Sequence, residues 1–207
     1  MTTEAVASAG ADEALPARGR HRGAYLEMLI SSFLGLAASL VLSIDAVVLA
    51  ADPNAGLSCN ISETISCAKV GITWQANLLG FPNAFLGLIA EPVVITIAVA
   101  GLGGVRFPRW FMNSAMAVYA VGLGFAYWLF LQAYFVIGAM CPWCLLITAT
   151  TTTVFASLLR VNLSDNTFGL SPRAHDRALY LLRIGADIWG TILIIAILAA
   201  MVIVRYL

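Results

Sequence analysis

The sequence predicts an all-α protein that crosses a membrane with five helices. Of its 207 residues, 61% are hydrophobic and only 11% are charged, whereas a soluble domain carries about a quarter charged residues. The apolar residues also form five runs close to the roughly 20 residues that a helix needs to cross the hydrocarbon core. Backbone polar groups cannot stay unpaired in lipid, so these runs are predicted to be helices. They cover residues 26–50, 79–104, 111–137, 142–160 and 181–204.

The segments outside these runs are polar. Residues 1–24 are rich in Ala, Gly and charge and predict a disordered cytoplasmic tail, and residues 161–180 predict a polar cytoplasmic connector before the fifth span, 181–207. The first run could instead belong to a cleaved signal peptide, but it has about 25 apolar residues where such a peptide has 7–15. The formal net charge of zero gives no indication of nucleic-acid binding.

Basic residues predict the orientation, because cytoplasmic loops are enriched in Lys and Arg. If the spans alternate, nine of the 11 basic residues share one side, and only Lys69 and Arg205 lie on the other. We therefore expect a multi-pass protein of the cell membrane with a cytoplasmic N-terminus. The connection at 51–78 and the turn near 138–142 would then face outward. The nine are Arg18, Arg20, Arg22, Arg106, Arg109, Arg160, Arg173, Arg177 and Arg183.

The cysteines all fall on the predicted outer side. An even number of cysteines on an oxidising face indicates disulfide pairing or redox chemistry. Both histidines, His21 and His175, are far from every cysteine in sequence, which argues against a Cys/His zinc site, and we predict no metal. The two pairs are Cys59 with Cys67 in the first outer connection, and Cys141 with Cys144 at the second outer turn.

The second pair forms the motif Cys141-Pro142-Trp143-Cys144. This spacing lets two sulfurs form a reversible disulfide, and proline suits the first turn of a helix. The positive end of that helix stabilises thiolates, which are the attacking species in disulfide exchange. The motif is also compatible with a structural disulfide, half of a zinc site or inert buried thiols. A thioredoxin domain would need a soluble βαβ pattern, which the sequence lacks.

The first pair, Cys59 and Cys67, is separated by eight positions in a polar connection. It could carry a disulfide toward a soluble partner or back toward Cys141, or form a structural loop disulfide. Two pairs together favour an electron relay from a soluble protein to an acceptor in the membrane. A quinone suits this role because it dissolves in lipid and takes two electrons. Aromatic residues of the third span could line a ring pocket or form an interfacial belt: Phe125, Tyr127, Trp128, Phe130, Tyr134 and Phe135.

Three motifs in order carry a resemblance to a known family. They are Cys59 followed by Cys67-Ala-Lys-Val-Gly-Ile-Thr73, then Phe81-Pro-Asn83-Ala-Phe-Leu-Gly87, then Cys141-Pro-Trp-Cys144. Over about residues 25–160 this set resembles the vitamin K epoxide reductase family. The resemblance implies a redox core of four helices bundled around a quinone, with the 51–78 connection as a lid. The fifth helix is additional to that core.

The resemblance also implies a role for each cysteine. Cys144 would lie next to the quinone ring, and Cys141 would exchange with the loop pair through a transient disulfide to Cys67. Cys59 would meet a thioredoxin-like dithiol protein on the outer face, which in bacteria oxidises secreted proteins. The expected function is therefore a thiol–quinone oxidoreductase that supports disulfide formation. Its quinone would be menaquinone, ubiquinone or a vitamin K-type naphthoquinone.

Two further positions match the family pattern. Asn83 would offer a hydrogen bond to a quinone oxygen, and Thr73 matches a Ser/Thr position near the active site. By itself, Asn83 would be interpreted as a polar contact between helices. Some animal members have Tyr where this chain has Thr148, which favours quinone reduction over epoxide reduction. Many bacterial members carry a fused thioredoxin-like domain; this chain ends after a fifth span, so we expect a separate partner.

Two acidic residues and three alternative functions remain. Glu91 lies in mid-span, where we expect a structural bond to another helix rather than a proton relay, and Asp45 is expected at the headgroup level. A small transporter or channel with structural disulfides would show repeats or many polar residues along its spans, and both signals are weak here. The other bacterial disulfide-forming quinone reductase has its Cys-x-x-Cys in the first outer loop instead. An assembly subunit without chemistry is the third alternative.

Overall fold

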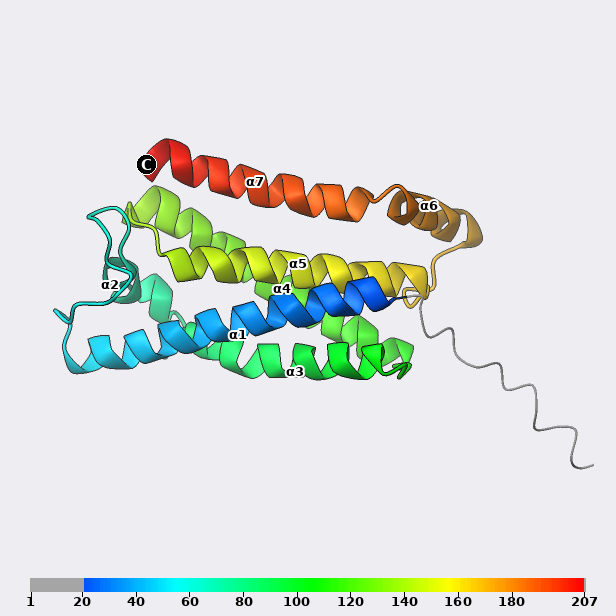
Figure 1. Cartoon of the computed structure of the whole chain (residues 1–207), viewed down its shortest axis with the longest axis horizontal. Coiled ribbons are helices and arrows are strands. Elements are labelled where there is room, and N and C mark those ends of the chain that lie inside the picture. The colour runs from blue at the N-terminus through cyan, green and yellow to red at the C-terminus, as the bar shows by residue number, and fades with distance from the viewer. Residues whose placement is uncertain (1–20, 207) are drawn as a thin grey trace, which may run out of the picture.

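A computed structural model describes residues 21–206, and five long helices lie side by side in it (Figure 1). All five are long and apolar enough to cross a membrane. The described residues contain one isolated β-bridge and no strand, so the predicted all-α membrane fold is confirmed. The five are α1 (Arg22–Ala51), α3 (Ala84–Leu102), α4 (Arg109–Gln132), α5 (Pro142–Ser164) and α7 (Ala186–Tyr206), and a π-helical turn, η2 (Ala133–Ile137), extends α4.

Helix α1 packs against both α3 and α5, while α4 packs on α5. Small residues allow α1 and α3 to come close, as is common between membrane helices. A Cβ atom on Gly87 of α3 would overlap the Ser39 side chain of α1, and one on Gly35 would lie 2.8 Å from a carboxylate oxygen of Glu91. This close approach requires glycine at both positions.

Glu91 is buried in the bundle and accepts a hydrogen bond from the Tyr119 hydroxyl at 3.2 Å. The bond joins α3 to α4, in agreement with the structural interpretation of this carboxylate. Around it lies the main apolar core, which fills the half of the bundle that holds the start of α1 and the end of α5. Its fully buried members include Met28, Ala98, Val154, Leu158 and Val161.

The predicted polar connector at 161–180 is largely helical. Helix α5 continues to Ser164, α6 spans Pro172–Arg183, and α7 begins only at Ala186. Helix α6 mixes charged and apolar residues, so it has no apolar run of spanning length and resembles a loop in composition. A turn at Gly185, whose φ is 74°, separates α6 from α7.

The N-terminal tail and the first outer connection also differ in detail from the predicted boundaries. Of the predicted disordered tail, residues 1–20 lie outside the described residues, and Arg22 already begins α1. The outer connection contains a short helix, α2 (Cys67–Gly71), and a 3-10 turn, η1 (Trp74–Asn77), before α3 begins at Ala84 rather than at 79.

Helix α7 lies at the periphery, against α5 and α6. Only Thr191 and Leu198 of this helix are buried. At its end, the Tyr206 hydroxyl donates to the Ala133 and Tyr134 carbonyl oxygens at 3.4 and 3.2 Å. These two carbonyls belong to η2, so the end of the fifth helix is joined to the turn that precedes the Cys-x-x-Cys motif.

Candidate functional site

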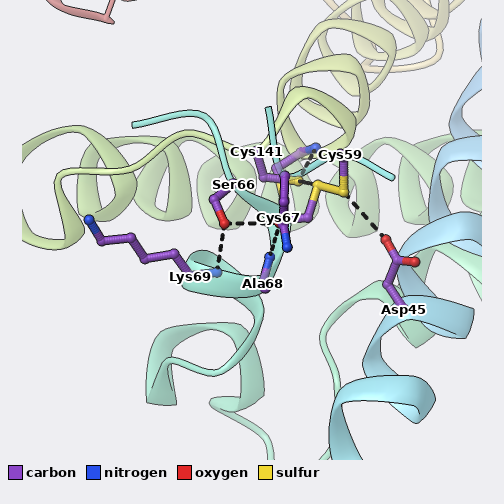
Figure 2. The surroundings of a disulfide bond; sticks show 9 residues. Asp45, Cys59, Ser66, Cys67, Ala68, Lys69 and Cys141 are labelled. Carbon is purple, nitrogen blue, oxygen red and sulfur yellow. Dashed lines mark hydrogen bonds between the residues drawn. A yellow bond between two sulfur atoms is a disulfide. The ribbon is translucent and has the colours of Figure 1, made fainter. Parts of the chain in front are cut away.

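All four cysteines gather at one end of the bundle, where α1 ends and α5 begins (Figures 1 and 2). Cys59 and Cys67 form a disulfide, whereas Cys141 and Cys144 are free thiols. The side chains of Cys59, Cys67 and Cys141 are buried, and that of Cys144 is half-buried. Their apolar surroundings come from α1, the loop, α2 and α5: Leu42, Leu57, Val70 and Trp143.

The loop disulfide is held by local hydrogen bonds on either side of Cys67. Ser66 caps α2, because its hydroxyl oxygen accepts the Lys69 backbone N–H at 3.2 Å. The same hydroxyl donates to the side-chain oxygen of Asn60 at 2.9 Å, and the backbone N–H of Ala68 donates to that oxygen at 3.1 Å. The start of α2, and with it Cys67, therefore has a defined position relative to the chain next to Cys59.

The loop is docked by backbone hydrogen bonds onto the turn before Cys141. Ser66 N–H donates to the Met140 carbonyl oxygen at 3.1 Å, and Met140 N–H donates to the Thr64 carbonyl oxygen at 2.8 Å. Gly138 makes this turn possible, since it ends η2 with a φ of 68°, a conformation that favours glycine. This pairing brings residues more than 70 positions apart in sequence into register.

The central contact of the site joins the two cysteine pairs. Cys141 Sγ lies 3.2 Å from Cys67 Sγ (Figure 2), within the range of a near-attack geometry of about 3–3.5 Å. The sequence left open whether the loop pair bonds within itself or reaches back to Cys141. In the structure, Cys59 and Cys67 form a disulfide, and Cys67 is in contact with Cys141 without a bond between them.

Cys141 is placed to act as a thiolate. It caps α5, and its sulfur accepts the Cys144 backbone N–H at 3.4 Å. A hydrogen bond from the Cys144 side chain lowers the pKa of Cys141, and the backbone N–H groups of Cys144 and Trp143 lower it further, against the opposing effect of burial. Pro142 occupies the first helical turn, as the motif predicted.

One acidic residue reaches the site without a signal in the sequence. A carboxylate oxygen of Asp45 lies 3.6 Å from Cys59 Sγ. The sequence suggested only the headgroup level for this residue, because nothing in the spacing indicates which way the loop folds back over the end of α1. Figure 2 shows Asp45 directed from α1 toward the disulfide.

Asn83 and Thr73 lie beside η1 and are hydrogen-bonded to backbone. The Asn83 side-chain amide donates to the Gln75 carbonyl oxygen at 2.6 Å. Its own oxygen is buried without a hydrogen-bond partner among the described residues. The Thr73 hydroxyl donates to the Val70 carbonyl oxygen at 2.7 Å and accepts the Ala76 N–H at 3.4 Å. Thr73 therefore caps η1, whereas Asn83 retains a free acceptor oxygen. None of the hydrogen bonds described for these two side chains is to a cysteine.

The residues present fit a quinone in two respects. The free oxygen of Asn83 can accept a hydroxyl of the reduced ring, and Cys144 is half-buried at the start of a spanning helix. The aromatic residues of the third span differ in their surroundings. Trp128 packs on Trp74 of η1, with ring centres 6.1 Å apart, and stacks on Phe125, while Phe135 is largely exposed.

Positive charge is concentrated at the opposite end of the bundle from the cysteines. Arg22 begins α1, Arg109 begins α4, and three arginines lie on α6. Figure 1 places these elements together at the end far from α2. The described spans therefore alternate as the orientation prediction assumed, while Arg18 and Arg20 lie outside the described residues.

Comparison with known protein families gives a match. A family model, described as the vitamin K epoxide reductase family, matches residues 26–159. This range includes all four cysteines, Thr73 and Asn83, and it ends within α5, before α6 and α7. No curated protein matches the chain. The family predicted from the motifs is confirmed.

Proposed function

Because this chain belongs to the vitamin K epoxide reductase family, we propose that it is a membrane thiol–quinone oxidoreductase. It would reoxidise a thioredoxin-like dithiol protein outside the cytoplasm, pass the electrons to a quinone and so support disulfide formation. Membership itself implies a membrane oxidoreductase. The identity of the electron donor, the identity of the electron acceptor and the side of the membrane go beyond what membership implies. The observation that carries it is the 3.2 Å separation between the sulfurs of Cys67 and Cys141.

Electrons enter through the loop pair. A partner thiolate attacks Cys59 of the Cys59–Cys67 disulfide, and the thiolate of Cys67 leaves. The second thiolate of the partner attacks the partner's own sulfur in this mixed disulfide, which releases the oxidised partner and frees Cys59. The Cys67 thiolate attacks Cys141 of an oxidised Cys141–Cys144 pair and the Cys144 thiolate leaves, so one disulfide replaces another at each exchange. Cys59 is only 5% exposed, so partner binding must first move the loop away from its position over Cys141.

Electrons leave through the inner pair. A quinone bound beside Cys144 would supply a two-electron acceptor that diffuses in the lipid. Cys144 provides the thiolate nearest the span, and Cys141 closes the disulfide when the pair gives up its electrons. Asn83 would orient the reduced ring by accepting a ring hydroxyl with its unpartnered oxygen, while Thr73, as the cap of η1, supports the segment to which Asn83 is bonded. With free thiols at Cys141 and Cys144, the described state is the one ready to reduce an acceptor.

The arginines at the other end of the bundle support the proposal that the cysteine end faces outward. Lys and Arg are enriched on the cytoplasmic side, and the start of α1 and helix α6 carry them here. A maleimide that does not cross membranes should therefore label a single cysteine introduced at Ser62, which is exposed in the loop, in intact cells. A cysteine introduced at Arg177 of α6 should be labelled only after permeabilisation.

The test of function uses purified protein in detergent or nanodiscs, a short-chain menaquinone or ubiquinone, and a reduced thioredoxin-like protein, followed by ultraviolet absorbance of the quinone. Wild type should turn over and Cys144→Ala should not. Cys59→Ala and Cys67→Ala should lose turnover with the protein dithiol but keep it with dithiothreitol, which does not need the loop. Quinone reduction by Cys144→Ala would refute the assignment.

A thiol count separates this proposal from a channel or an assembly subunit with structural disulfides. After full reduction and removal of reductant, addition of one equivalent of quinone should lower the number of maleimide-reactive thiols by two, and excess quinone should lower it by four as both cysteine pairs are oxidised. The Cys141→Ser/Cys144→Ser variant is the control, since it should show no change. An unchanged count in wild type would leave the cysteines a structural role.

A further inference from the structure

The carboxylate of Asp45 has one contact that the relay described above does not use. Its oxygen lies 3.6 Å from Cys59 Sγ and within 4.8 Å of Cys67 Sγ. Asp45 is half-buried on α1, and Cys59 is 5% exposed. The contact is therefore sheltered by the loop (Figure 2).

No cation balances Asp45 among residues 21–206. No ion pair involves it, and the nearby Lys69 directs its ammonium to the Glu63 carbonyl oxygen at 3.2 Å. Figure 2 places that ammonium on the far side of the cluster. The sulfurs that lie within 4.8 Å of Asp45 are those of the Cys59–Cys67 disulfide, and the titratable thiol that interacts with it electrostatically is Cys141. Asp52, at the end of the same helix, is exposed and accepts the Asn54 N–H.

The chemistry of this contact depends on one proton. A sulfur atom in a disulfide has no hydrogen to donate, so an ionised carboxylate at this distance would face an electron-rich atom without compensation. A protonated carboxyl group can donate to that sulfur. When the disulfide opens, Cys59 can hold the proton and donate it to the carboxylate. The same geometry therefore suits both redox states if the proton moves between the two groups.

We propose that Asp45 is the proton donor and acceptor for Cys59 during exchange between the loop disulfide and Cys141, a role that rests on the proposed function. In a Cys67–Cys141 mixed disulfide, the Cys59 thiol gives its proton to Asp45 and its sulfur attacks Cys67. The Cys59–Cys67 bond forms and the Cys67–Cys141 bond breaks. The electron pair of the broken bond stays on Cys141, where the Cys144 N–H stabilises it.

This step involves no net oxidation, and its product is the arrangement described: a Cys59–Cys67 disulfide with Cys141 Sγ 3.2 Å away. In reverse, Asp45 returns the proton to Cys59 as Cys59 leaves. A base is needed because an ordinary thiol, with a pKa of about 8.5, is only a few per cent thiolate at neutral pH, and a neighbouring carboxylate opposes ionisation further.

Infrared spectroscopy tests the proton transfer directly. In the Cys141→Ser/Cys144→Ser variant the loop pair is the only redox couple, so no quinone is needed. Reduction with dithiothreitol should remove a protonated-carboxyl C=O band and add S–H bands. Asp45→Glu should shift the carboxyl band and Asp45→Asn should abolish it, whereas Asp52→Asn, the matched control on the same helix, should change nothing. A carboxyl region unaltered by reduction would overturn the proposal.

Turnover by the full chain provides the kinetic arm. General acid–base catalysis contributes about 10²–10⁴-fold, and because thiols ionise partly without help, we expect Asp45→Asn to slow turnover with a reduced thioredoxin-like protein and quinone by about 10- to 100-fold. Asp45→Glu should restore most of the rate, and Asp52→Asn should match wild type. An Asp45→Asn rate within twofold of wild type would overturn the proposal.

The two arms distinguish failure of this inference from failure of the proposed function. If wild type does not reduce quinone, the function is wrong, and the infrared result alone decides the role of Asp45. If Asp45→Asn does not fold, the shifted carboxyl band of Asp45→Glu decides it. Absence of that shift would assign the band to another residue and refute the inference.

Discussion

A variant that keeps only Cys67 and Cys141 tests the contact on which the relay depends. In Cys59→Ser/Cys144→Ser each remaining thiol has lost its partner in the resting pairs. Because the two sulfurs are 3.2 Å apart, we expect them to form a disulfide spontaneously in air or in a mild glutathione buffer. This bond is the mixed disulfide that the relay requires as an intermediate.

The expected yield can be estimated from the geometry. An S–S bond is about 2.05 Å long, so the sulfurs must approach by about 1.1 Å, and the hydrogen bonds of Met140 to Thr64 and Ser66 already hold the loop in place. Well-oriented intramolecular groups reach effective molarities of about 10⁵–10⁸ M. Even an effective molarity of about 1 M would favour this disulfide about 10³-fold over a mixed disulfide in about 1 mM glutathione.

Non-reducing peptide mapping by mass spectrometry measures the outcome, with a maleimide gel shift as a second measure of free thiols. The matched control is Cys59→Ser/Cys141→Ser, which leaves Cys67 and Cys144 and should remain mostly reduced, since Cys141 is the residue in contact with Cys67. A test variant that retains two free thiols in most molecules would refute the inference that the loop presents Cys67 to Cys141.

Three further predictions follow from other contacts. Cys144→Ala removes the largest cause of the lowered pKa of Cys141, so the ultraviolet thiolate titration of Cys141 should move to higher pH. A thiol with a depressed folded pKa adds stability that is full above its unfolded pKa and lost as pH falls through the folded value, so the Tm advantage of wild type over this variant should grow with rising pH. Gly87→Ala should lower the free energy of unfolding by about 1–3 kcal/mol through overpacking, whereas Gly122→Ala, with open space around it, should have little effect on thermal unfolding in detergent. Asn83→Ala should raise the inhibition constant of the quinol product about tenfold through loss of one buried hydrogen bond from a ring hydroxyl, without changing reduction of the loop disulfide by dithiothreitol.

Each of these has a contradicting result. Equal melting temperatures for Gly87→Ala and Gly122→Ala would mean that α1 and α3 are not in close contact. An unchanged titration in Cys144→Ala would assign the acidity of Cys141 to the end of α5 alone. An unchanged inhibition constant of the quinol for Asn83→Ala would leave its buried oxygen without a role in binding.

The sequence was sufficient for the spanning helices because hydropathy and length control insertion into lipid. It failed for α6, whose mixed polar and apolar residues have the composition of a loop, and for the start of α3, where turns occupy the apolar positions before Ala84. Local composition does not separate an amphipathic surface helix from a connector when only long apolar runs are sought.

The candidate site likewise has features that the sequence predicted and contacts that it did not. The Cys-x-x-Cys motif at the start of α5 follows from local spacing, and the family pattern carried the choice of Asn83. The contact between Asp45 and Cys59 depends on how the 51–78 loop folds back over α1, and the position of Cys67 on Cys141 depends on backbone pairing between Thr64 and Met140. These are long-range arrangements, and no pattern within either segment encodes them.

The bond from Tyr206 to the carbonyls of η2 has a practical consequence for anyone who labels this protein. A fluorescent reporter or affinity tag fused just after the fifth helix would pull on the turn that leads into Cys141, and a loss of activity in such a fusion would be misread as a defect in chemistry. Fusions are better placed before α1, at the end of the bundle that holds no cysteine. The turnover rate of Tyr206→Phe would measure how strongly the terminal helix affects the redox centre.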